Sequence, residues 1–371
     1  MSPGKLPART ARRTLVPAAI AALALVGGLS APAKAGVAEE PVVGGLITPL
    51  SLAIAPDGTV YVAQNFAGML TRATPGAEPE VVYTAAEGTE VGAVSVSGGE
   101  VTFATSFMGR PQDTRLMRLG EGGSATEVAD LWAFEKASNP DGGIRYGIVR
   151  LSESCKDRFG KGESWMLPYR GIKESHPYAS TTVAGTTYVA DAAANAVLEV
   201  SATGEVATTA VLPATRVEIT RKIRKALELP RCAQGKTYKL EAVPTDVEEG
   251  PDGNLYVTTL PGGPEIPQMG RNGAVYRIDV GTGSVRRVAG GLVTPTGLAI
   301  GPDGTSYVSM LFASTILEQP LLGEPGTLAE VPLPGDVEYH DGRVYATVTD
   351  LMSDGSQPPS GEVRSWTVGV D

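Results

Sequence analysis

One segment of this chain occurs twice in nearly the same form. Residues 43–62 and 289–308 align without a gap, and 14 of the 20 aligned positions are identical. Weaker copies of the segment begin near residues 91, 178, 244 and 335. An internal repeat indicates an architecture of like units, because each unit has to pack on its neighbours to bury its apolar face.

Each copy has the pattern of a β-hairpin. A short apolar run leads into Pro-Asp-Gly or another glycine-bearing turn, and a run rich in Val, Tyr and Thr follows. Most copies are followed by two more strand-like runs, such as 274–280 and 285–289. Four antiparallel strands make one propeller blade, so the copies predict an all-β, six-bladed β-propeller.

The sequence also predicts how the ring closes. Residues 41–46 match residues 288–292, which form the last strand of their own unit, whereas the final unit offers only three strands before the chain stops. We therefore expect the N-terminal strand to complete the last blade and to lie beside the C-terminal strand. A closed ring leaves no open sheet edge, and for that reason we expect a monomer.

Residues 1–35 have the pattern of a signal peptide, which would leave 36–371 as the mature propeller domain. A positive start and an apolar stretch at 15–29 precede the small residues Ala33-Lys34-Ala35. The sequence thus predicts a secreted, extracytoplasmic protein. The pair Arg12-Arg13 leaves both the general and the twin-arginine export routes open.

The charge of the chain excludes two classes of partner. The net charge is −10, and it falls to −15 without residues 1–35, which hold five cations and no carboxylate. Such a surface repels phosphate, so we expect neither nucleic acid nor a membrane as partner. A basic segment at 216–231 is the exception; it predicts a short helix capped by Thr220, with a solvated basic face or a clamp for an anion.

The two cysteines, Cys155 and Cys232, predict a disulfide. An even number of cysteines in an exported chain favours pairing, and both residues lie in irregular segments on either side of the third repeat.

Long insertions indicate where function lies. They occupy residues 132–176, 213–243, 260–272 and 351–360, and each joins two blades or the second and third strands of one blade. Both kinds of connection emerge at the same face of a propeller, and loops on a rigid scaffold commonly carry binding residues. The candidate ligand-binding residues on this rim are Asn139, Asp141, His176, Tyr178, Asp191, Asn195, Thr245, Asp246 and Asp350.

The chemistry of these residues leaves a metal site open. Their oxygen atoms would suit Ca²⁺, but Asp and Asn also occur in turns because they cap backbone amides. A three-histidine zinc site is excluded because the chain has two histidines. The nucleophile pattern Gly-x-Ser-x-Gly is absent from the sequence.

Several motifs together resemble those of the ScyD/ScyE family of exported bacterial proteins. They are Asn139-Pro140-Asp141-Gly142-Gly143, His176-Pro177-Tyr178-Ala179, Val189-Ala190-Asp191-Ala192 with Asn195, Val243-Pro244-Thr245 and Thr259-Leu260-Pro261-Gly262-Gly263-Pro264. The repeats are similar, more loosely, to NHL and gluconolactonase-type six-bladed propellers. The resemblance implies a propeller but no defined activity and no catalytic residues.

Two functions follow from the sequence. The first, which the sequence favours, is a non-catalytic module that binds an extracytoplasmic ligand or protein through the elaborated rim. The second is a divalent-metal-dependent hydrolase or lactonase that acts at the mouth of the axial channel, where Asp246 would take part.

Overall fold

The computed structural model describes residues 38–264, 266–351 and 358–369. The predicted signal peptide, residues 1–35, lies outside the described residues. Within them, no helix combines the length and the apolar character that crossing a bilayer requires.

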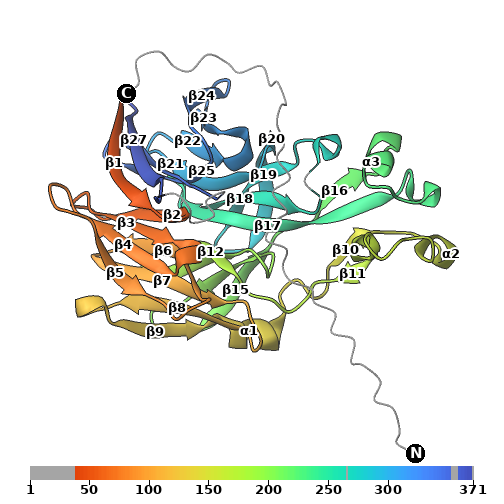
Figure 1. Cartoon of the computed structure of the whole chain (residues 1–371), viewed down its shortest axis with the longest axis horizontal. Helices are drawn as coiled ribbons and strands as arrows, with labels where there is room; N and C mark the ends of the chain where they lie inside the picture. The colour runs from red at the N-terminus through yellow and green to blue at the C-terminus, as the bar shows by residue number, and fades with distance from the viewer. Residues whose placement is uncertain (1–37, 265, 352–357, 370–371) are drawn as a thin grey trace, which may run out of the picture. The chain divides into compact units, whose positions relative to one another are not determined.

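Five antiparallel sheets have four strands each and are regular propeller blades (Figure 1). The first holds β2 (Pro49–Ile54), β3 (Val60–Gln64), β4 (Met69–Ala73) and β5 (Glu80–Thr84). The second holds β6 (Glu90–Ser97), β7 (Glu100–Phe107), β8 (Asp113–Leu119) and β9 (Ala125–Asp130). The third holds β12 (Pro177–Val183), β13 (Thr186–Asp191), β14 (Ala196–Val200) and β15 (Val206–Val211). The last two hold β21 (Pro295–Ile300), β22 (Ser306–Met310), β23 (Thr315–Gln319) and β24 (Gly326–Glu330), and then β25 (Pro334–His340), β26 (Arg343–Val348), β27 (Gly361–Thr367) and β1 (Glu39–Leu46).

The remaining sheet has seven strands and departs from the blade pattern. Its blade-like part holds β17 (Thr237–Glu249), β18 (Leu255–Gly262), β19 (Gly273–Asp279) and β20 (Ser284–Leu292). Three further strands belong to the insertions: β10 (Arg145–Ile148), β11 (Tyr169–Arg170) and β16 (Thr215–Glu218). We call this sheet the extended sheet.

The prediction of six like blades is therefore wrong, since the described residues form five four-stranded blades. The reason is the length of β17, which has 13 residues. Its first half pairs with β10 and β16, and its second half pairs with β18 along residues 241–249. The insertions thus continue the sheet outward instead of forming separate loops.

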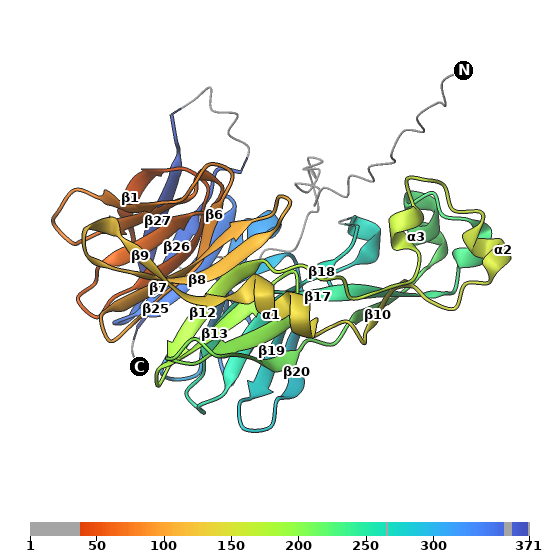
Figure 2. The same cartoon turned by 90° about the horizontal axis from the view of Figure 1, so that it is seen from below.

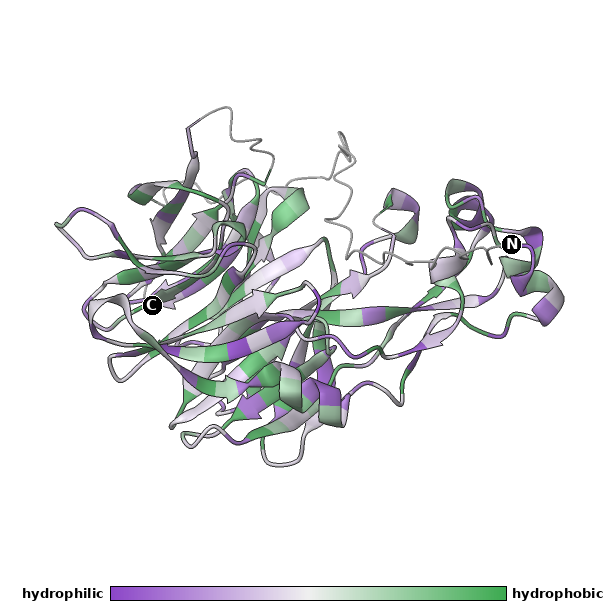
Figure 3. Cartoon of the chain, turned by 60° about the horizontal axis from the view of Figure 1, so that its bottom comes forward, coloured by the Kyte–Doolittle hydropathy of each residue, from purple (hydrophilic) through white to green (hydrophobic). Residues whose placement is uncertain are grey.

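The sheets close into a ring through their innermost strands. The strands β2, β6, β12, β17, β21 and β25 contact one another in this order, and β25 contacts β2. The extended sheet therefore takes the place between the sheets of β12 and β21. Green apolar segments lie mainly within the sheets in Figure 3, as expected for a core between packed sheet faces.

The chain termini close the ring as predicted. Strand β1 pairs antiparallel with β27, from Glu39 opposite Trp366 to Leu46 opposite Gly361. Val43 and Leu46 of β1 are buried in one apolar cluster with Leu52 and Val363. The N-terminal strand thus covers what would otherwise be an open edge of the last blade.

The repeated Pro-Asp-Gly motif forms the same turn in both of its closest copies. The amide of Thr59 donates to Asp57 Oδ1 at 3.0 Å, and the amide of Thr305 donates to Asp303 Oδ1 at 2.9 Å. Gly58 and Gly304 have φ angles of 81° and 83°, a conformation that favours glycine. The turn chemistry explains why this motif is the best-preserved part of the repeat.

Residues 145–170 and 215–240 form an arm that extends from one side of the ring (Figures 1 and 2). The arm also contains two short helices, α2 (Glu153–Lys156) and α3 (Arg221–Ala226). Thr220 caps α3 as predicted, since its hydroxyl accepts from the amide of Ile223 at 3.2 Å. Ile148, Ile219 and Tyr238 are among the buried residues of a separate apolar cluster in this arm.

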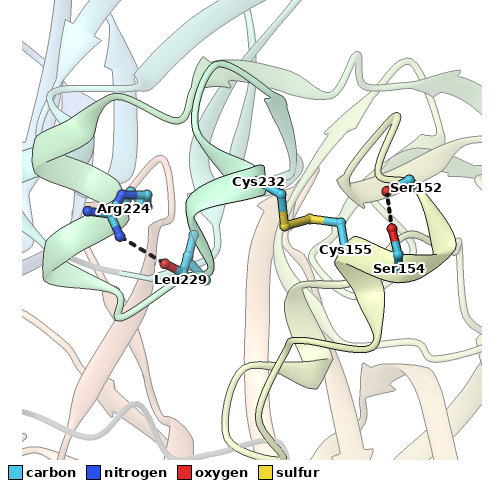
Figure 4. Close-up of a disulfide and its surroundings, with 6 residues drawn as sticks. All are labelled: Ser152, Ser154, Cys155, Arg224, Leu229 and Cys232. Carbon is cyan, nitrogen blue, oxygen red and sulfur yellow. Dashed lines mark hydrogen bonds between the residues drawn. A yellow bond between two sulfur atoms is a disulfide. The ribbon is translucent and has the colours of Figure 1, made fainter.

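The predicted disulfide between Cys155 and Cys232 is confirmed and joins the two halves of the arm (Figure 4). Cys155 is buried in the apolar cluster of the arm. The bond links residues that are 77 positions apart, so it restricts a long loop of the unfolded chain.

Removing this disulfide is expected to loosen the arm and to leave the ring intact. Replacing both Cys155 and Cys232 by Ala should lower the free energy of unfolding of the arm by about 4 kcal/mol, the chain-entropy value for a loop of this length. Hydrogen exchange should become faster in residues 145–170 and 215–240 alone. An equal loss of protection in the four-stranded sheets would contradict this separation of arm and ring.

Candidate functional site

The insertions emerge at one face of the ring. They follow β9, β15, β18 and β26, and they leave the ring where the innermost strands begin. Of the last insertion, residues 352–357 lie outside the described part of the chain. The structure divides the predicted site residues into three groups, and Asp350 belongs to none of them.

The first group lies where the innermost strands β6 and β12 begin, and we call this end of the ring axis the mouth of the channel. His176 immediately precedes β12, and Glu90 is the first residue of the neighbouring innermost strand β6. Their side chains are joined from His176 Nε2 to Glu90 Oε2 at 3.0 Å, and they are 26% and 25% exposed. Tyr178, the second residue of β12, is half-buried beside them. We call Glu90, His176 and Tyr178 the mouth group.

The surroundings of the mouth group set its protonation. Burial alone would lower the pKa of His176, but the hydrogen bond and charge of Glu90, with the charge of Asp191, raise it above the ordinary value. Burial raises the pKa of Tyr178, and the charges of Asp336, Asp246 and Glu90 raise it further. The tyrosine therefore remains a hydrogen-bond donor at neutral pH, and the histidine titrates at a higher pH than a free imidazole.

Four carboxylates lie on two of the innermost strands, which surround the ring axis. Asp246 and Glu248 lie on β17, and Asp336 and Glu338 lie on β25. These strands are separated in the ring by β21, and the charges of the β25 carboxylates raise the pKa of both Asp246 and Glu248. Their side chains thus meet near the axis, and we call them the channel carboxylates.

Burial is the main cause of the unusual protonation of this group. It raises the pKa of Asp336 to about 7, although the amides of Leu52 and Val337 oppose the shift. It also raises the pKa of Asp246, Glu248 and Glu338 well above their ordinary values, and like charges add to the shift. At neutral pH some of these four carboxyl groups are therefore protonated.

Asp246 and Asp336 have a structural role that sequence analysis missed. Asp336 accepts from the amide of Val337 in its own strand and from the amide of Leu52 in the next sheet, both at 2.8 Å. Asp246 accepts in the same way from Val247 and from Leu298 of the next sheet. Thr245 adds a hydrogen bond of 2.9 Å to the carbonyl of Pro295. These residues link neighbouring sheets, and each carboxylate oxygen of the two aspartates accepts one backbone amide.

The channel carboxylates predict that stability falls as the pH rises from about 4 to about 7. An acid with a raised pKa binds its proton more tightly in the folded chain, so its contribution is complete below the unfolded pKa and is lost as the pH passes the folded pKa. For Asp336 the shift from 3.8 to about 7 corresponds to a loss on the order of 4 kcal/mol across this window. Urea denaturation at a series of pH values measures it.

Replacing Glu338 by Gln should flatten this dependence, because it removes one raised pKa and one charge that raises those of Asp246 and Glu248. The matched control is Glu330→Gln, at an exposed position of β24. Stability that increases over this pH range, or a dependence that is unchanged in Glu338→Gln, would contradict the assignment.

The third group lies where the sheets of β6 and β12 meet, and four of its five residues are buried. Helix α1 (Leu131–Ser138) contacts β8 and β15 above this junction, and the motif 139–143 follows the helix. Glu135, Asp141 and Asp191 have no exposed surface, and Asn195 is 1% exposed. Together with Asn139, which ends α1, we call these residues the buried cluster.

Within this cluster, Asp191 has enough partners to be explained by structure alone. It accepts from the Ser175 hydroxyl at 2.6 Å and from the His176 amide at 2.7 Å. The amides of Ala193 and Ala194 also donate to it, at 3.2 and 3.1 Å. Asp191 therefore fixes the segment that carries His176 into β12.

Glu135 and Asp141 are less well compensated. Burial raises the pKa of Glu135 to about 8, and the charges of Asp191 and Asp141 contribute to the shift. Burial also raises the pKa of Asp141, against the hydrogen bond from Asn195, whose Nδ2 donates to Asp141 Oδ2 at 2.8 Å. The cluster is a dense group of acidic and amide oxygens.

Asp350 belongs to none of these groups. Among the described residues, the hydroxyl of Ser360 donates to Asp350 Oδ2 at 2.6 Å. Its prediction as a site residue rested on its place in an insertion, and no hydrogen bond of the described residues links it to another candidate.

Sequence analysis missed Glu90, Glu135, Glu248, Asp336 and Glu338. The channel positions had a signal, because the copies at 244–257 and 335–348 place Asp246 with Asp336 and Glu248 with Glu338. Glu135 had none, since α1 belongs to an insertion without a counterpart in the other repeats.

Comparison with known proteins supports the fold only. No family model and no curated protein matches the chain, so membership of the ScyD/ScyE family stays a prediction. Among solved structures, the PQQ-bound aldose sugar dehydrogenase of Streptomyces coelicolor is 14% identical with a TM-score of 0.55, covering 91% of this chain and 99% of that one.

Two further structures are similar at the same level. A putative glucose dehydrogenase of Thermus thermophilus is 17% identical with a TM-score of 0.52, covering 89% of this chain and 100% of that one. A gluconolactonase of Xanthomonas campestris is 10% identical with a TM-score of 0.52, covering 90% of each chain. All three support the β-propeller fold, and at these identities they say nothing of the family or the reaction.

Proposed function

We propose that this protein is a hydrolase that opens uncharged or cationic esters or lactones at the mouth of the channel. The observation that carries the proposal is the pair of His176 and Glu90, which bridges two innermost strands at the elaborated face and stays partly exposed. A histidine held by a carboxylate is a common general base. This reading replaces the non-catalytic binding module that the sequence favours.

The mouth group supplies the parts of an acyl hydrolysis. With Nε2–H of His176 donating to Glu90, the lone pair on Nδ1 takes a proton from water as the water oxygen attacks the carbonyl carbon. The Tyr178 hydroxyl donates to the carbonyl oxygen, on which negative charge develops. When the bond from the carbonyl carbon to the ester oxygen breaks, the proton on His176 passes to the leaving alkoxide, and an acid and an alcohol result.

The charge of the channel favours this class of substrate. The channel carboxylates and Glu90 repel anions, so they disfavour an anionic substrate and help to release the carboxylate product. The same argument disfavours a PQQ-dependent dehydrogenase, the kind of protein that one structural neighbour is. PQQ is a polycarboxylate, and the described residues of the mouth group and channel offer His176 as their one group that can become cationic.

A divalent metal at the mouth, as the sequence suggests, does not fit the donors there. Both oxygens of Asp246 accept backbone amides, as do both of Asp336. In the described part of the chain, no three His, Cys, Asp or Glu side chains are spaced to share an ion. The proposed reaction therefore rests on His176 and Tyr178.

We also propose that the protein works outside the cytoplasm. The Cys155–Cys232 disulfide supports this location, because such bonds persist in oxidising compartments.

A panel of three probes tests the proposed activity. Glucono-δ-lactone and p-nitrophenyl acetate are uncharged, and p-nitrophenyl hemisuccinate carries a carboxylate. We expect turnover of at least one uncharged probe, little turnover of the anionic one, and a rate that rises with pH through a pKa above 6.5, the ordinary value for histidine. Absence of turnover with both uncharged probes, or a preference for the hemisuccinate, would contradict the proposal.

A further inference from the structure

Five oxygen atoms of the buried cluster have no hydrogen bond of regular geometry, although the Tyr146 hydroxyl acts on Asp141 and lowers its pKa. They are both carboxylate oxygens of Glu135 and the Oδ1 atoms of Asn139, Asp141 and Asn195. An ionised carboxylate in this position costs several kcal/mol unless a cation or a set of donors compensates it. Five such carboxylate and carboxamide oxygens in one buried cluster need an explanation.

The hydrogen bonds of the two asparagine side chains orient their amide oxygens. Nδ2 of Asn139 donates to the carbonyl of Gly171 at 3.2 Å, and Nδ2 of Asn195 donates to Asp141 Oδ2, so the amide oxygens face the other way. Asn139 follows Glu135 by one helical turn, and its amide donates to the Glu135 carbonyl at 2.9 Å.

Gly171 lies directly beside the carboxylate of Asp141. A Cβ atom at this position would lie 1.9 Å from Asp141 Oδ1, so the chain can pass here only as glycine. The segment that follows leads through Ser175 to His176.

In the part of the chain that the structure describes, two groups that can carry positive charge act on the cluster. His176 acts on Asp191. Lys173 acts on Glu135, but it is exposed and its ammonium group donates to the carbonyl of Lys136. The backbone amide of Glu174 also acts on Glu135 and lowers its pKa. Among the described residues, none of the recorded ion pairs involves Glu135, Asp141 or Asp191.

We propose that the buried cluster binds one Ca²⁺ ion. Glu135 would supply two oxygens, and Asp141, Asn139 and Asn195 one each. These are five of the six to eight oxygens that Ca²⁺ takes, and water or backbone carbonyls would supply the rest. Hard oxygen donors, a bidentate carboxylate and neutral carboxamide oxygens are the ligand set that Ca²⁺ takes, whereas Zn²⁺ prefers nitrogen and sulfur. The proposed ligands are two carboxylates and two carboxamides. Such a site does not need three acidic side chains around one ion.

This ion is structural and independent of the proposed hydrolysis. The cluster is buried, so substrate does not reach the ion. It would connect the end of α1 to the turn after β13, and through Asp141 it would hold Gly171 and the segment that leads to His176. The site goes beyond the proposed function, and either can fail without the other.

Equilibrium dialysis of the full chain with ⁴⁵Ca²⁺, after treatment with EDTA, tests the proposal directly. We expect one ion per chain and a rise in Tm of about 3 to 6 °C at saturating Ca²⁺. Zn²⁺ at the same concentration should not reproduce the rise. A chain that retains no Ca²⁺ at millimolar concentration, or whose Tm is unchanged, would overturn the proposal.

Variants distinguish this cluster from the exposed acids. Asp141→Asn should weaken Ca²⁺ binding by at least about 100-fold, and Glu153→Gln, at an exposed position of the arm, should leave it unchanged. If Asp141→Asn does not fold, Asn195→Asp provides the second test. It adds a charged ligand, so we expect a less stable calcium-free chain and a larger rise in Tm with Ca²⁺. Equal binding by the wild type and all three variants would place the ion elsewhere.

Discussion

Replacing His176 by Gln is expected to slow hydrolysis of the best uncharged probe by about 10² to 10⁴-fold, the range for loss of a general base. The Gln amide lies near the position of Nε2 and can still donate to Glu90, so the neighbouring strands should keep their contact. The group that takes the proton is lost. Initial rates measured under saturating probe report kcat directly.

His340 provides the matched control, since it is the other histidine of the chain. It is the last residue of β25, at the opposite end of the innermost strand from the insertions. His340→Gln should keep the wild-type rate within about two-fold, because surface positions away from the chemistry contribute little. Equal losses in the two variants would remove His176 from the reaction.

Glu90→Gln tests whether His176 acts as a base, because it changes the pH–rate profile, which a purely structural role of His176 would leave unchanged. The charge and hydrogen bond of Glu90 raise the pKa of His176. Without that charge the rising limb of the pH–rate profile should move to lower pH. A limb that stays in place would show that another group titrates.

Replacing Leu46 by Asp is expected to lower the free energy of unfolding by about 3 to 5 kcal/mol. Leu46 is 3% exposed and packs in the cluster where β1 joins the last blade. The change removes apolar burial and puts an unpaired charge at the ring closure. Chemical denaturation of the chain measures the loss.

Val42→Asp is the matched control on the same strand. Val42 is 36% exposed, and its replacement should change the stability by less than about 1 kcal/mol. If Leu46→Asp cost no more than Val42→Asp, strand β1 would not contribute to closing the ring.

The parts of the fold that depend on local contacts within the repeat could be predicted. The Asp-Gly turns, with their side-chain contacts to Thr59 and Thr305, mark each hairpin, and the match between residues 41–46 and 288–292 identified the strand that closes the ring. The extended sheet could not be predicted. Its strands β10 and β16 pair with β17 over long sequence distances, and such pairing leaves no local pattern.

The candidate site was predictable in part for the same reason. Asn139, Asp141 and Asn195 were chosen as oxygen donors, and the fold brings them together, but Glu135 on α1 has no repeat to place it. Asp246 was chosen as a ligand, and its oxygens instead link two sheets. A sequence indicates which side chains have the right chemistry, whereas hydrogen bonding in the folded chain decides which remain free to act.

A crystal structure of His176→Gln soaked with the best uncharged probe tests the central claim most directly. The account predicts intact probe at the channel mouth, with its carbonyl oxygen within hydrogen-bonding distance of the Tyr178 hydroxyl. Probe bound against the arm or the outer strands, with the mouth holding solvent alone, would contradict it.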